Sequence, residues 1–448
     1  MRELTNFPYQ RVLVLGLAKS GTAVTQLLVR NQIEVKVNDL KTPEDDDNVR
    51  LLREQGIQVE LGRHPLSLLE QVDVVIKNPG IPYENPIVEE AVAREIPVIT
   101  EMELIPYFGV EEIVAITGSN GKTTTTTLIY QIYQAAQRET ALAGNIGHVA
   151  SEVAEQMTDQ QTMIVELSSF QLLGIEVFKP KVAVLLNIFA AHLDYHHTLE
   201  NYQQAKANIT KNQLPTDYLV YNADDATVSS MIKTSQAQLI PFSSHKVVKN
   251  GAYVEGGVIC FQETQVMDLR DLVLVGEHNL ENVLAAVCVA KIDGISNHAI
   301  QEVLTSFTGV AHRLQFVKEL AGRRFYNDSK ATNILATSKA LSAFQQPVIL
   351  LAGGLDRGNA FDELIPFMTQ VKGLVLFGET GEKLQRLGEE MGVPDIIMVD
   401  DMPSAVQKSY QLSEAGDVIL LSPACASWDQ YKTFEERGNM FVDAVHKL

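Results

Sequence analysis

Short apolar runs alternate with helical patterns along the whole chain. In the first region these runs end beside glycine or amide residues, as in Gly16–Gly21 after the first run and Asn78-Pro79-Gly80 after a later one. The expected strands are Arg11–Leu15, Glu34–Asn38 and Asp73–Lys77, with a helix between the first two that ends at Arg30. Strands that alternate with helices predict a parallel sheet with helices on its faces.

Two further series of strands and helices follow. The second begins near Glu112 with a strand, Ile113–Ile116, a glycine loop and a helical pattern over Thr123–Ala136. Its other expected elements are the strands Met163–Leu167 and Val182–Asn187, shorter strands and turns between residues 218 and 271, and the helix Glu277–Ala290. The third begins near Gly309, with expected strands at Arg324–Asn327, Val348–Leu351, Leu374–Phe377, Ile396–Val399 and Val418–Leu421.

The length of the chain agrees with three such series. A chain of 448 residues holds about three domains at roughly 150 residues per domain. We therefore expect an α/β fold with three domains, over residues 1–101, 102–309 and 310–448, of which the central one has a mostly parallel sheet.

Composition and charge narrow the class of protein. The chain has 46% hydrophobic and 21% charged residues, which is ordinary for a globular protein. Its formal net charge of −20 disfavours nucleic-acid binding, because phosphate contacts along a nucleic acid need many Lys and Arg side chains. A local basic loop can still hold a small anion on an acidic protein.

The cysteines and the apolar runs indicate where in the cell the chain is expected to lie. Cys260, Cys288 and Cys425 lack the close spacing of metal ligands, and their number and spacing fit a reducing environment. Residues 1–10 lack the pattern of a signal peptide, and the longest apolar runs are too short to span a bilayer. We expect a cytoplasmic protein without membrane insertion.

The segment Thr117–Thr123, with the sequence TGSNGKT, carries the strongest chemical signal. Glycines let a loop curl so that several N–H groups point at one anion, and the following helix start favours negative charge. Lys122 supplies a point charge for phosphates, and the Thr123 hydroxyl is placed to bind Mg²⁺. Ile116 stands where the longer form of this motif has glycine, so the match is to a shortened form. The residues expected to contact ATP phosphates are Gly118, Ser119, Asn120, Gly121, Lys122, Thr123 and Thr124.

Two side chains near expected strand ends are candidate metal ligands. Glu166 lies at the carboxyl end of an apolar strand, where ligands bind in open parallel sheets, and a carboxylate can hold Mg²⁺ directly or through water. A solvated charge is the alternative interpretation. His192 follows the next strand. A lone histidine is more often structural, but with Glu166 at a neighbouring strand end a metal role is favoured.

The Gly16–Gly21 loop suits a pyrophosphate or a uracil–ribose contact, because it lies at the start of a helix. The same pattern, with Asp39 as the ribose acid, is typical of dehydrogenases. The second phosphate loop at Thr117–Thr123 makes a plain dehydrogenase the weaker interpretation.

The whole chain resembles the Mur ligases of bacterial peptidoglycan synthesis. The matching segments are Thr117–Thr125, Asn145–Gly147, Glu166–Ser169, His192–Asp194, His278-Asn279 with Asn282, His312-Arg313 and Asn327–Asn333. The C-terminal run Ser422–Ser427, followed by Trp428-Asp429-Gln430 and Phe434–Gly438, is similar to the subgroup that adds D-glutamate to UDP-N-acetylmuramoyl-L-alanine.

The resemblance implies a Rossmann-like N-terminal domain that binds the UDP-substrate, a central P-loop-type ATPase domain and a C-terminal Rossmann-like α/β domain that binds the amino acid. It implies a monomeric, cytoplasmic ligase of cell-wall precursor synthesis, a process tied to cell shape and division. It implies ATP and Mg²⁺, with two metal sites, and an acyl-phosphate intermediate. The implied UDP-substrate site comprises Lys19, Ser20, Asp39, Lys41, Gly80, Asn145 and His192. The implied further ATP contacts are Asn279, Asn282, Arg313 and Asp328, and the implied amino-acid site comprises Lys330, Thr332, Arg357, Ser427 and Phe434.

Several of these assignments depart from what the residues alone suggest. The implied metal ligands are Thr123, Glu166, His192 and Lys206, and the implied catalytic residues are Lys122, His192 and Lys206. In relatives the lysine at the position of Lys206 is carbamylated, whereas by pattern alone it is an exposed helix lysine. Asn279 alone would be read as a helix cap. Relatives often have Lys in place of Arg357, and we interpret Trp428 as a packing residue.

Three other functions fit parts of the pattern. A folylpolyglutamate synthetase-type ligase would add glutamate to a folate, but would not need the Gly16–Gly21 segment. A non-catalytic nucleotide-binding module would bind ATP without D-glutamate-dependent phosphate release. An oxidoreductase would show an activity linked to a nicotinamide cofactor.

Overall fold

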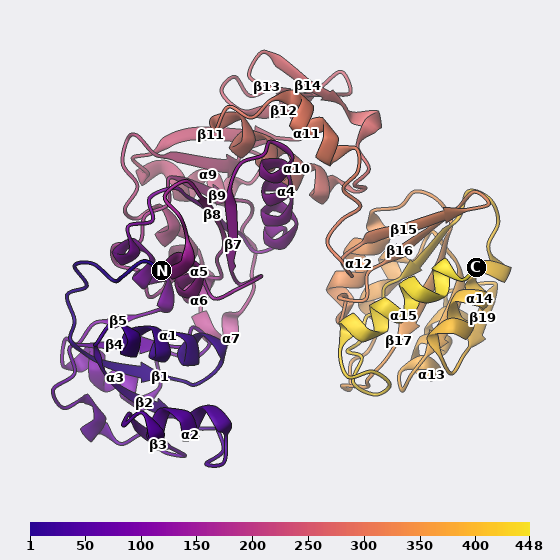
Figure 1. The fold of residues 1–448 in the computed structure, drawn as a ribbon. Helices are drawn as coiled ribbons and strands as arrows, with labels where there is room; N and C mark the ends of the chain where they lie inside the picture. The colour runs from indigo at the N-terminus through magenta and orange to yellow at the C-terminus, as the bar shows by residue number, and fades with distance from the viewer. The chain divides into compact units, whose positions relative to one another are not determined.

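The chain forms two compact units (Figure 1). The computed structural model describes residues 1–448. One unit consists of Met1–Arg270 with Glu281–Val303, and the other of Asp271–Leu280 with Leu304–Leu448. The first unit contains two β-sheets and the second contains one, each mostly parallel. The expected three-part α/β fold is therefore confirmed, while the boundaries at residues 101 and 309 stay predictions.

The N-terminal sheet has the strand order β3-β2-β1-β4-β5, and all its strands are parallel. Its elements are β1 (Arg11–Leu15), α1 (Lys19–Arg30), β2 (Glu34–Asp39), α2 (Asp47–Glu54), β3 (Gln58–Leu61), η1 (Leu66–Leu69), β4 (Val74–Lys77), α3 (Pro86–Ala93), β5 (Val98–Ile99) and η2 (Glu101–Phe108). The chain order reverses between β1 and β4, and loops that follow such neighbouring strands diverge and leave a crevice.

The central sheet has the order β14-β13-β12-β11-β10-β9-β6-β8-β7. The strands from β7 to β12 in this row pair in parallel, and β13 and β14 add antiparallel pairs at one edge. The strands are β6 (Ile113–Thr117), β7 (Thr140–Gly144), β8 (Thr162–Glu166), β9 (Val182–Leu185), β10 (Tyr218–Asn222), β11 (Gln238–Ser243), β12 (Ala252–Glu255), β13 (Val258–Phe261) and β14 (Thr264–Asp268).

Short and long helices connect these strands. The helices are α4 (Lys122–Ala135), α5 (Ala150–Gln156), α6 (Ser169–Leu172), α7 (Leu193–His196), α8 (Leu199–Ala207), η3 (Asn208–Thr210), α9 (Ala226–Met231), η4 (Ile232–Thr234), η5 (Leu269–Asp271), α10 (Glu277–Ile292) and α11 (Asn297–Leu304). The expected strand Val182–Asn187 is too long, because β9 ends at Leu185. Beyond it, Asn187 hydrogen-bonds to the Ser119–Asn120 backbone.

The C-terminal sheet has the order β15-β16-β20-β17-β18-β19, in which only β15 is antiparallel to its neighbour. Its elements are β15 (Gln315–Leu320), β16 (Arg323–Asn327), α12 (Ile334–Ser342), β17 (Val348–Gly353), η6 (Asp362–Phe367), β18 (Val371–Phe377), α13 (Gly381–Glu390), β19 (Asp395–Met398), α14 (Met402–Leu412), β20 (Val418–Leu421) and α15 (Phe434–His446).

Alternation along β17 explains why this strand is a continuous apolar run. Leu350 and Ala352 belong to the core shared with α12 and α13, whereas Ile349 and Leu351 belong to the core shared with α14 and α15. A parallel strand that is covered on both faces needs apolar residues at every position. The sheet therefore carries a hydrophobic core on each side.

Arg437 ties together the loops at one end of this sheet. Its side chain is 0% exposed. Its guanidinium donates to Ser329 Oγ (3.0 Å) and O (2.9 Å) and to Cys425 O (3.0 Å). Burial lowers the pKa of Arg437 to about 10. Because a planar guanidinium offers five donors in fixed directions, one side chain holds two loops that carry predicted amino-acid contacts.

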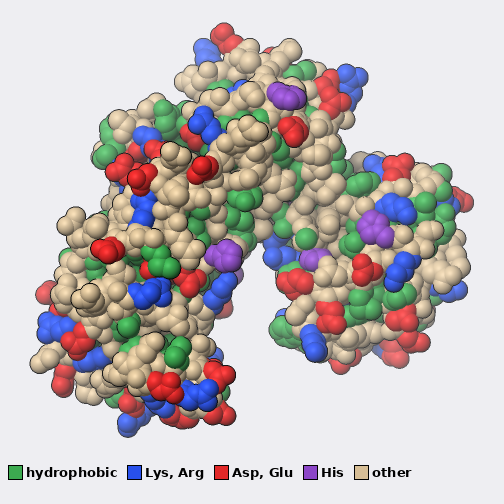
Figure 2. All heavy atoms as spheres, viewed as in Figure 1, with side chains coloured by type: hydrophobic (Ala, Val, Ile, Leu, Met, Phe, Trp, Pro, Cys, Tyr) green, Lys and Arg blue, Asp and Glu red, His purple; other side chains and the backbone are tan.

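The cysteines, the helices and the surface charges can be compared with the features expected of the whole chain. Cys260, Cys288 and Cys425 are all free and buried. None of the helices combines the length and the apolar character that a crossing of a bilayer requires. On the face shown in Figure 2, acidic and basic side chains are interspersed.

Candidate active site

The phosphate loop lies between β6 and α4 and has the backbone that its glycines allow. Gly118 has φ +157° and Gly121 has φ +84°. A Cβ on Gly121 would collide with the side chain of Asn282, and one on Gly118 would crowd Leu186. No side-chain hydrogen bond caps the start of α4, and the positive end of a helix dipole favours an anion at such a start.

Asn187 shapes this loop from the neighbouring strand. Ser119 N donates to Asn187 O (2.9 Å), Asn120 N donates to Asn187 Oδ1 (2.8 Å), and Asn187 Nδ2 donates to Asn120 O (3.2 Å). Asn187 was not predicted from the sequence. An amide directly after a buried strand was the available signal, because β9 and β6 are neighbours in the sheet.

Two lysines converge on one carbonyl of the loop. Lys122 Nζ and Lys206 Nζ each donate to Gly118 O at 2.9 Å, and Lys206 also donates to Thr117 Oγ1 at 3.3 Å. Lys206 is 1% exposed, so its interpretation as an exposed helix lysine is wrong. The face of α8 that carries Tyr202 and Lys206 packs inward, which the sequence of α8 alone does not reveal.

The surroundings of Lys206 disfavour a positive charge on its amino group. Burial lowers the pKa of Lys206 well below its usual range, and the positive charge of Lys122 lowers it further, while Glu166 acts in the opposite direction. The ammonium form is therefore disfavoured beside the phosphate loop. An anionic ligand or an anionic modification would relieve this repulsion.

Glu166 and Asn145 meet at the ends of adjacent strands. Asn145 Nδ2 donates to Glu166 Oε1 at 2.8 Å, while Glu166 Oε2 is buried without a partner. A buried carboxylate oxygen without a donor is costly unless a cation satisfies it. The residues here therefore fit a divalent cation.

The small number of possible protein ligands near Glu166 indicates which divalent cation fits this position. The chain has no group of three or more His, Cys, Asp or Glu side chains that could hold a metal ion. Mg²⁺ does not require such a group, because it is commonly bound through one or two carboxylates together with substrate phosphates and water. Glu166 beside a phosphate loop matches that mode.

His192 lies just before α7 in a left-handed conformation, with φ +54° and ψ +36°. Its ring packs edge-on against Phe170, with 5.0 Å between centroids. Burial and the charge of Lys122 lower the pKa of His192, which favours the neutral imidazole that can accept a proton or bind a metal. The effect of Lys122 on His192 agrees with a common site.

Phe170 and His196 were not expected from the sequence. His196 Nε2 lies 2.9 Å from Ser169 Oγ, and the His196 ring stacks on Phe170 at 5.4 Å. Burial lowers the pKa of His196 to about 4. A neutral, buried histidine that is hydrogen-bonded and stacked supports the His192 segment structurally.

The two predicted asparagines of α10 have different surroundings. Thr125 Oγ1 donates to Asn282 Oδ1 at 3.2 Å, so the structure brings Asn282 to the phosphate-loop helix. Asn279 Nδ2 donates to Val275 O at 2.8 Å. Asn279 is inside α10, which begins at Glu277, and is not a helix cap.

A cavity of about 370 Å³ lies in the same unit as the phosphate loop. Four of the predicted UDP-substrate residues, Lys19, Ser20, Gly80 and Asn145, line it. Asp39, Lys41 and His192 do not. The remaining lining residues are Ala18, Asn78, Pro79, Glu101, Gly144, Gly147, Val149, Ser168, Phe170 and Gln171.

Asp39 holds the first glycine loop. Its carboxylate accepts hydrogen bonds of 2.7 Å from the N–H groups of Leu17, Lys41 and Thr42. Burial acts to raise the pKa of Asp39, but these backbone donors outweigh it, so the pKa is lowered. Asp39 therefore stays charged and shapes the rim of the N-terminal sheet, whatever contact its carboxylate makes with a substrate.

The second unit brings Arg313 and Asp328 into one electrostatic environment. Asp328 accepts from Leu314 N (3.0 Å) and Ser422 Oγ (2.9 Å). Burial raises the pKa of Asp328 to about 7, and the charge of Arg313 opposes this rise. Arg313 Nε is buried without a partner, so this pair retains a donor for a ligand.

The two predicted amino-acid-site cations of this unit, Lys330 and Arg357, each lie over an aromatic ring. Lys330 Nζ lies 5.3 Å from the centroid of the Phe434 ring, and the Arg357 guanidinium lies 4.9 Å from the Trp428 ring. Trp428 is 66% exposed, so its interpretation as a packing residue is wrong. Its neighbour Ser427 has a buried Oγ without a partner. The structure records no such contact for Thr332, whose N–H donates to the carbonyl of Lys330.

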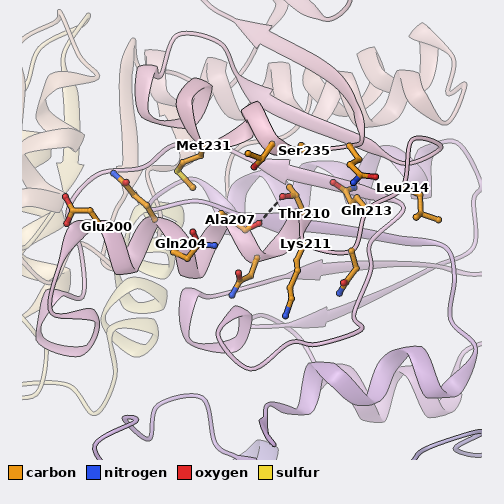
Figure 3. Close-up of a pocket in the computed structure, with 14 residues that line it drawn as sticks. Glu200, Gln204, Ala207, Thr210, Lys211, Gln213, Leu214, Met231 and Ser235 are labelled. Atoms are coloured by element: carbon orange, nitrogen blue, oxygen red, sulfur yellow. Dashed lines mark hydrogen bonds between the residues drawn. The ribbon is translucent and has the colours of Figure 1, made fainter. Parts of the chain in front are cut away.

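The larger cavity of the first unit lies elsewhere. A space of about 670 Å³ is lined by α8, η3 and η4 (Figure 3). It contains none of the predicted site residues and is lined mainly by amide and aliphatic side chains such as Gln204, Gln213 and Leu214. Size alone therefore does not identify the active site in this chain.

The site thus combines a glycine loop with two lysines, a neighbouring carboxylate with one unpaired oxygen, and a separate cavity in the same unit. These features define a nucleotide-binding enzyme of the P-loop type. Three family models match the chain. They are the MurD-like N-terminal domain of Mur ligases over residues 10–100, the Mur ligase middle domain over residues 116–290, and the Mur ligase glutamate ligase domain over residues 312–425. The chain belongs to the Mur ligase family.

Full-length relatives and solved structures agree with this assignment. The chain is 53% identical to the UDP-N-acetylmuramoylalanine--D-glutamate ligase of Oceanobacillus iheyensis over 100% of both chains. It is 54% identical to the protein of the same name from Bacillus subtilis, over 98% of both chains. The solved MurC ligase of Thermotoga maritima shares the fold, with a TM-score of 0.57 at 18% identity over 98% of this chain and 99% of that one.

Replacing Lys122 tests the phosphate loop. We expect Lys122→Ala to lower the rate of ATP-dependent turnover by about 10²- to 10³-fold, because it removes a positioned charge from a water-poor site. The chain should stay folded, since the Lys122 ammonium donates to two carbonyls of its own loop, Gly118 O and Ser119 O. Phosphate release and thermal unfolding measure the two effects.

Lys211→Ala is the matched control. Lys211 Nζ also donates to a backbone carbonyl, Ile175 O at 3.3 Å, but it lines the larger cavity of Figure 3. We expect its turnover to equal that of the unmodified chain. A folded Lys122→Ala variant with full activity would contradict the assignment of the loop.

Proposed function

We propose that this chain is an ATP-dependent ligase that joins D-glutamate to UDP-N-acetylmuramoyl-L-alanine in the synthesis of the peptidoglycan precursor. The observation that carries this function is the identity of 53–55% over essentially the whole chain to ligases of that name. The phosphate loop and the adjacent cavity provide the two sites in the first unit that such a reaction needs. We place the reaction in the cytoplasm.

Activation of a carboxylate is the chemical problem that the site addresses. The carboxylate of the L-alanyl group is a poor electrophile, so its oxygen first attacks the γ-phosphorus of ATP and forms an acyl phosphate while ADP leaves. The amine of D-glutamate then attacks the acyl carbon, an amide forms, and inorganic phosphate leaves. The chain mainly positions the reactants and neutralises charge.

The phosphate loop supports the first step. The uncapped start of α4 and the Lys122 ammonium adjoin the same loop, so they can hold the γ-phosphate and stabilise its developing charge. Mg²⁺ held by Thr123, Glu166 and His192, with Lys206 as a carbamate, would neutralise the phosphate oxygens. The neutral imidazole of His192 is in the form that binds a metal.

The cavity lined by Lys19 and Asn145 supports binding of the UDP-substrate. Asn145 donates to Glu166, so this cavity borders the proposed metal carboxylate. Lys19 Nζ lies 3.3 Å from Gly147 O at the same cavity and offers a positive charge to a diphosphate. The cavity therefore combines a cation for the anionic end of the substrate with a position next to the phosphate loop.

The second unit supports binding of D-glutamate and nucleotide. D-glutamate carries two carboxylates and one ammonium group, and Lys330 and Arg357 offer two cations. The unpaired Oγ of Ser427 adds a buried polar group beside Arg357's partner, Trp428. Arg313 and Asp328 are suited to contact the phosphate and ribose of ATP, because one has an unused donor and the other is a buried acceptor.

Phosphate release with alternative amino acids tests the function. The chain is incubated with ATP, Mg²⁺ and UDP-N-acetylmuramoyl-L-alanine, and D-glutamate, L-alanine and L-lysine are added in separate reactions. We expect D-glutamate alone to stimulate release, because the two cations of the second unit match its two carboxylates. Stimulation by another amino acid alone would contradict the proposed acceptor. ATP binding without any D-glutamate-dependent release would indicate a non-catalytic module.

We also propose that Lys206 carries a carbamate in the active chain. A neutral amine can add to the carbon of CO₂ and lose one proton, which leaves a carboxylate on Nζ. Burial and the charge of Lys122 favour the neutral amine of Lys206. The product would be an anion between Lys122 and a metal ion, so the repulsion between two neighbouring cations would become attraction.

Chemical rescue tests the carbamate. Lys206→Ala should lose most of its phosphate release, and formate or acetate should restore part of it by supplying the missing carboxylate. Lys122→Ala is the control, because it lacks a cation and should not respond to either anion. The absence of rescue in Lys206→Ala at any concentration would count against the carbamate.

A further inference from the structure

Lys77 is a buried lysine at the carboxyl end of β4 with only neutral partners. It is 1% exposed. Its Nζ donates to Ile81 O (2.9 Å), Pro79 O (3.2 Å) and the Tyr195 hydroxyl (3.0 Å). It also lies 4.9 Å from the centroid of the Tyr83 ring. Carbonyls, a phenol and ring faces thus surround a charge that most buried lysines neutralise with a carboxylate.

This arrangement has a cost that an apolar side chain would avoid. Burial lowers the pKa of Lys77 to about 7, and no acidic side chain offsets the effect. A methionine fills a similar volume without desolvating a charge. Packing alone therefore does not account for a lysine at this position. Its three hydrogen bonds are the feature that an apolar side chain could not provide.

The carbonyls that Lys77 holds belong to a loop of the substrate cavity. Asn78, Pro79 and Gly80 line that cavity. All peptide bonds in the chain are trans. In a trans peptide the C=O and N–H point in opposite directions, so fixing Pro79 O toward Lys77 turns the N–H of Gly80 away from it.

The outward side of this loop is tied to the first glycine loop. Gly80 N donates to Asn78 Oδ1 at 3.2 Å, and Asn78 Nδ2 donates to Ser20 Oγ at 3.1 Å. Ser20 lines the same cavity. Lys77 therefore holds the loop on the side away from the cavity, and Asn78 holds it on the cavity side. Together these contacts fix the orientation of the polar groups in this wall of the cavity.

Tyr195 connects the same loop to the segment that carries His192. Its hydroxyl lies 2.9 Å from Ile81 O and 3.2 Å from Pro79 O, so it shares both carbonyls with Lys77. The Tyr195 ring packs on Phe170 at 4.5 Å, and Phe170 in turn contacts the His192 ring and lines the cavity. One cluster of contacts thus joins β4, α7 and the cavity.

We propose that Lys77 and Tyr195 are positioning residues for the UDP-substrate: together they hold the Asn78–Ile81 loop in the shape that receives the anionic diphosphate. This inference rests on the proposed function. In its protonated form Lys77 also places a positive charge behind the cavity wall, where water screens it less than at the surface. Neither side chain needs to touch the substrate.

Steady-state kinetics with two variants test this role. In Lys77→Met and in Tyr195→Phe we expect the KM for the UDP-substrate to rise about tenfold for the lysine and less for the tyrosine, because charge-assisted hydrogen bonds are the stronger ones. The KM values for ATP and D-glutamate should stay unchanged. In the double variant the KM should rise by less than the product of the two single effects, since both side chains hold the same carbonyls.

Lys36→Met is the matched control. Lys36 lies on β2 of the same sheet, and its Nζ also donates to a backbone carbonyl, Glu70 O at 2.9 Å, but it does not line the cavity. Its KM for the UDP-substrate should not change. If Lys77→Met fails to fold, Tyr195→Phe decides alone, because it removes a single oxygen.

Calorimetric measurement of UDP-substrate binding to the unmodified chain distinguishes a failure of the proposed function from a failure of the positioning role of Lys77 and Tyr195. If the unmodified chain does not bind this substrate, the proposed function fails, and the role of Lys77 fails with it. If the unmodified chain binds and turns over the substrate and the folded variants keep its KM, only the positioning role is overturned. An equal rise in the KM values of all three substrates would also overturn it, because that pattern indicates a general structural role.

Discussion

Parallel pairing of β6 with β8 and β9 is the constraint on which the active site depends. In this register Ile116 lies beside Glu166 and Thr117 lies beside Leu185, so three strands end at the same edge of the central sheet. The phosphate loop, the Asn145–Glu166 pair and the Asn187 support all follow from that shared edge. Because the strand ends are fixed by the sheet core, the site groups do not depend on flexible loops for their positions.

The edge collects positive charge in a protein that is acidic as a whole. Lys122 and Lys206 share one carbonyl, and Glu166 is the acidic side chain that acts on Lys206 against them. The formal net charge is −20, whereas this local excess of cations suits the binding of a phosphate. Lys77 is a second case of local positive charge in this acidic chain. Its buried amino group is held by neutral groups behind the proposed substrate cavity.

The pattern of the chain predicted the long buried strands and the loop chemistry but not the contacts between distant segments. The apolar run Val418–Leu421 matched β20, whereas β3 and β5 were missed. The sequence of β3, QVEL, mixes polar and apolar residues over only four positions, and β5 has only two residues. The inward turn of Lys206 and the exposure of Trp428 depend on tertiary partners that no local pattern encodes. The second-unit residues such as Arg313 came from family resemblance alone, and the structure adds their partners and their unsatisfied atoms.

The central claim is that the site activates a carboxylate by phosphorylation and otherwise positions the reactants. Isotope transfer tests this most directly. The L-alanyl carboxylate of the UDP-substrate is labelled with ¹⁸O at both oxygens, and the products of one turnover are analysed by mass spectrometry. An acyl-phosphate route predicts one labelled oxygen in the released phosphate and one in the new amide. Unlabelled phosphate formed together with the amide product would contradict it.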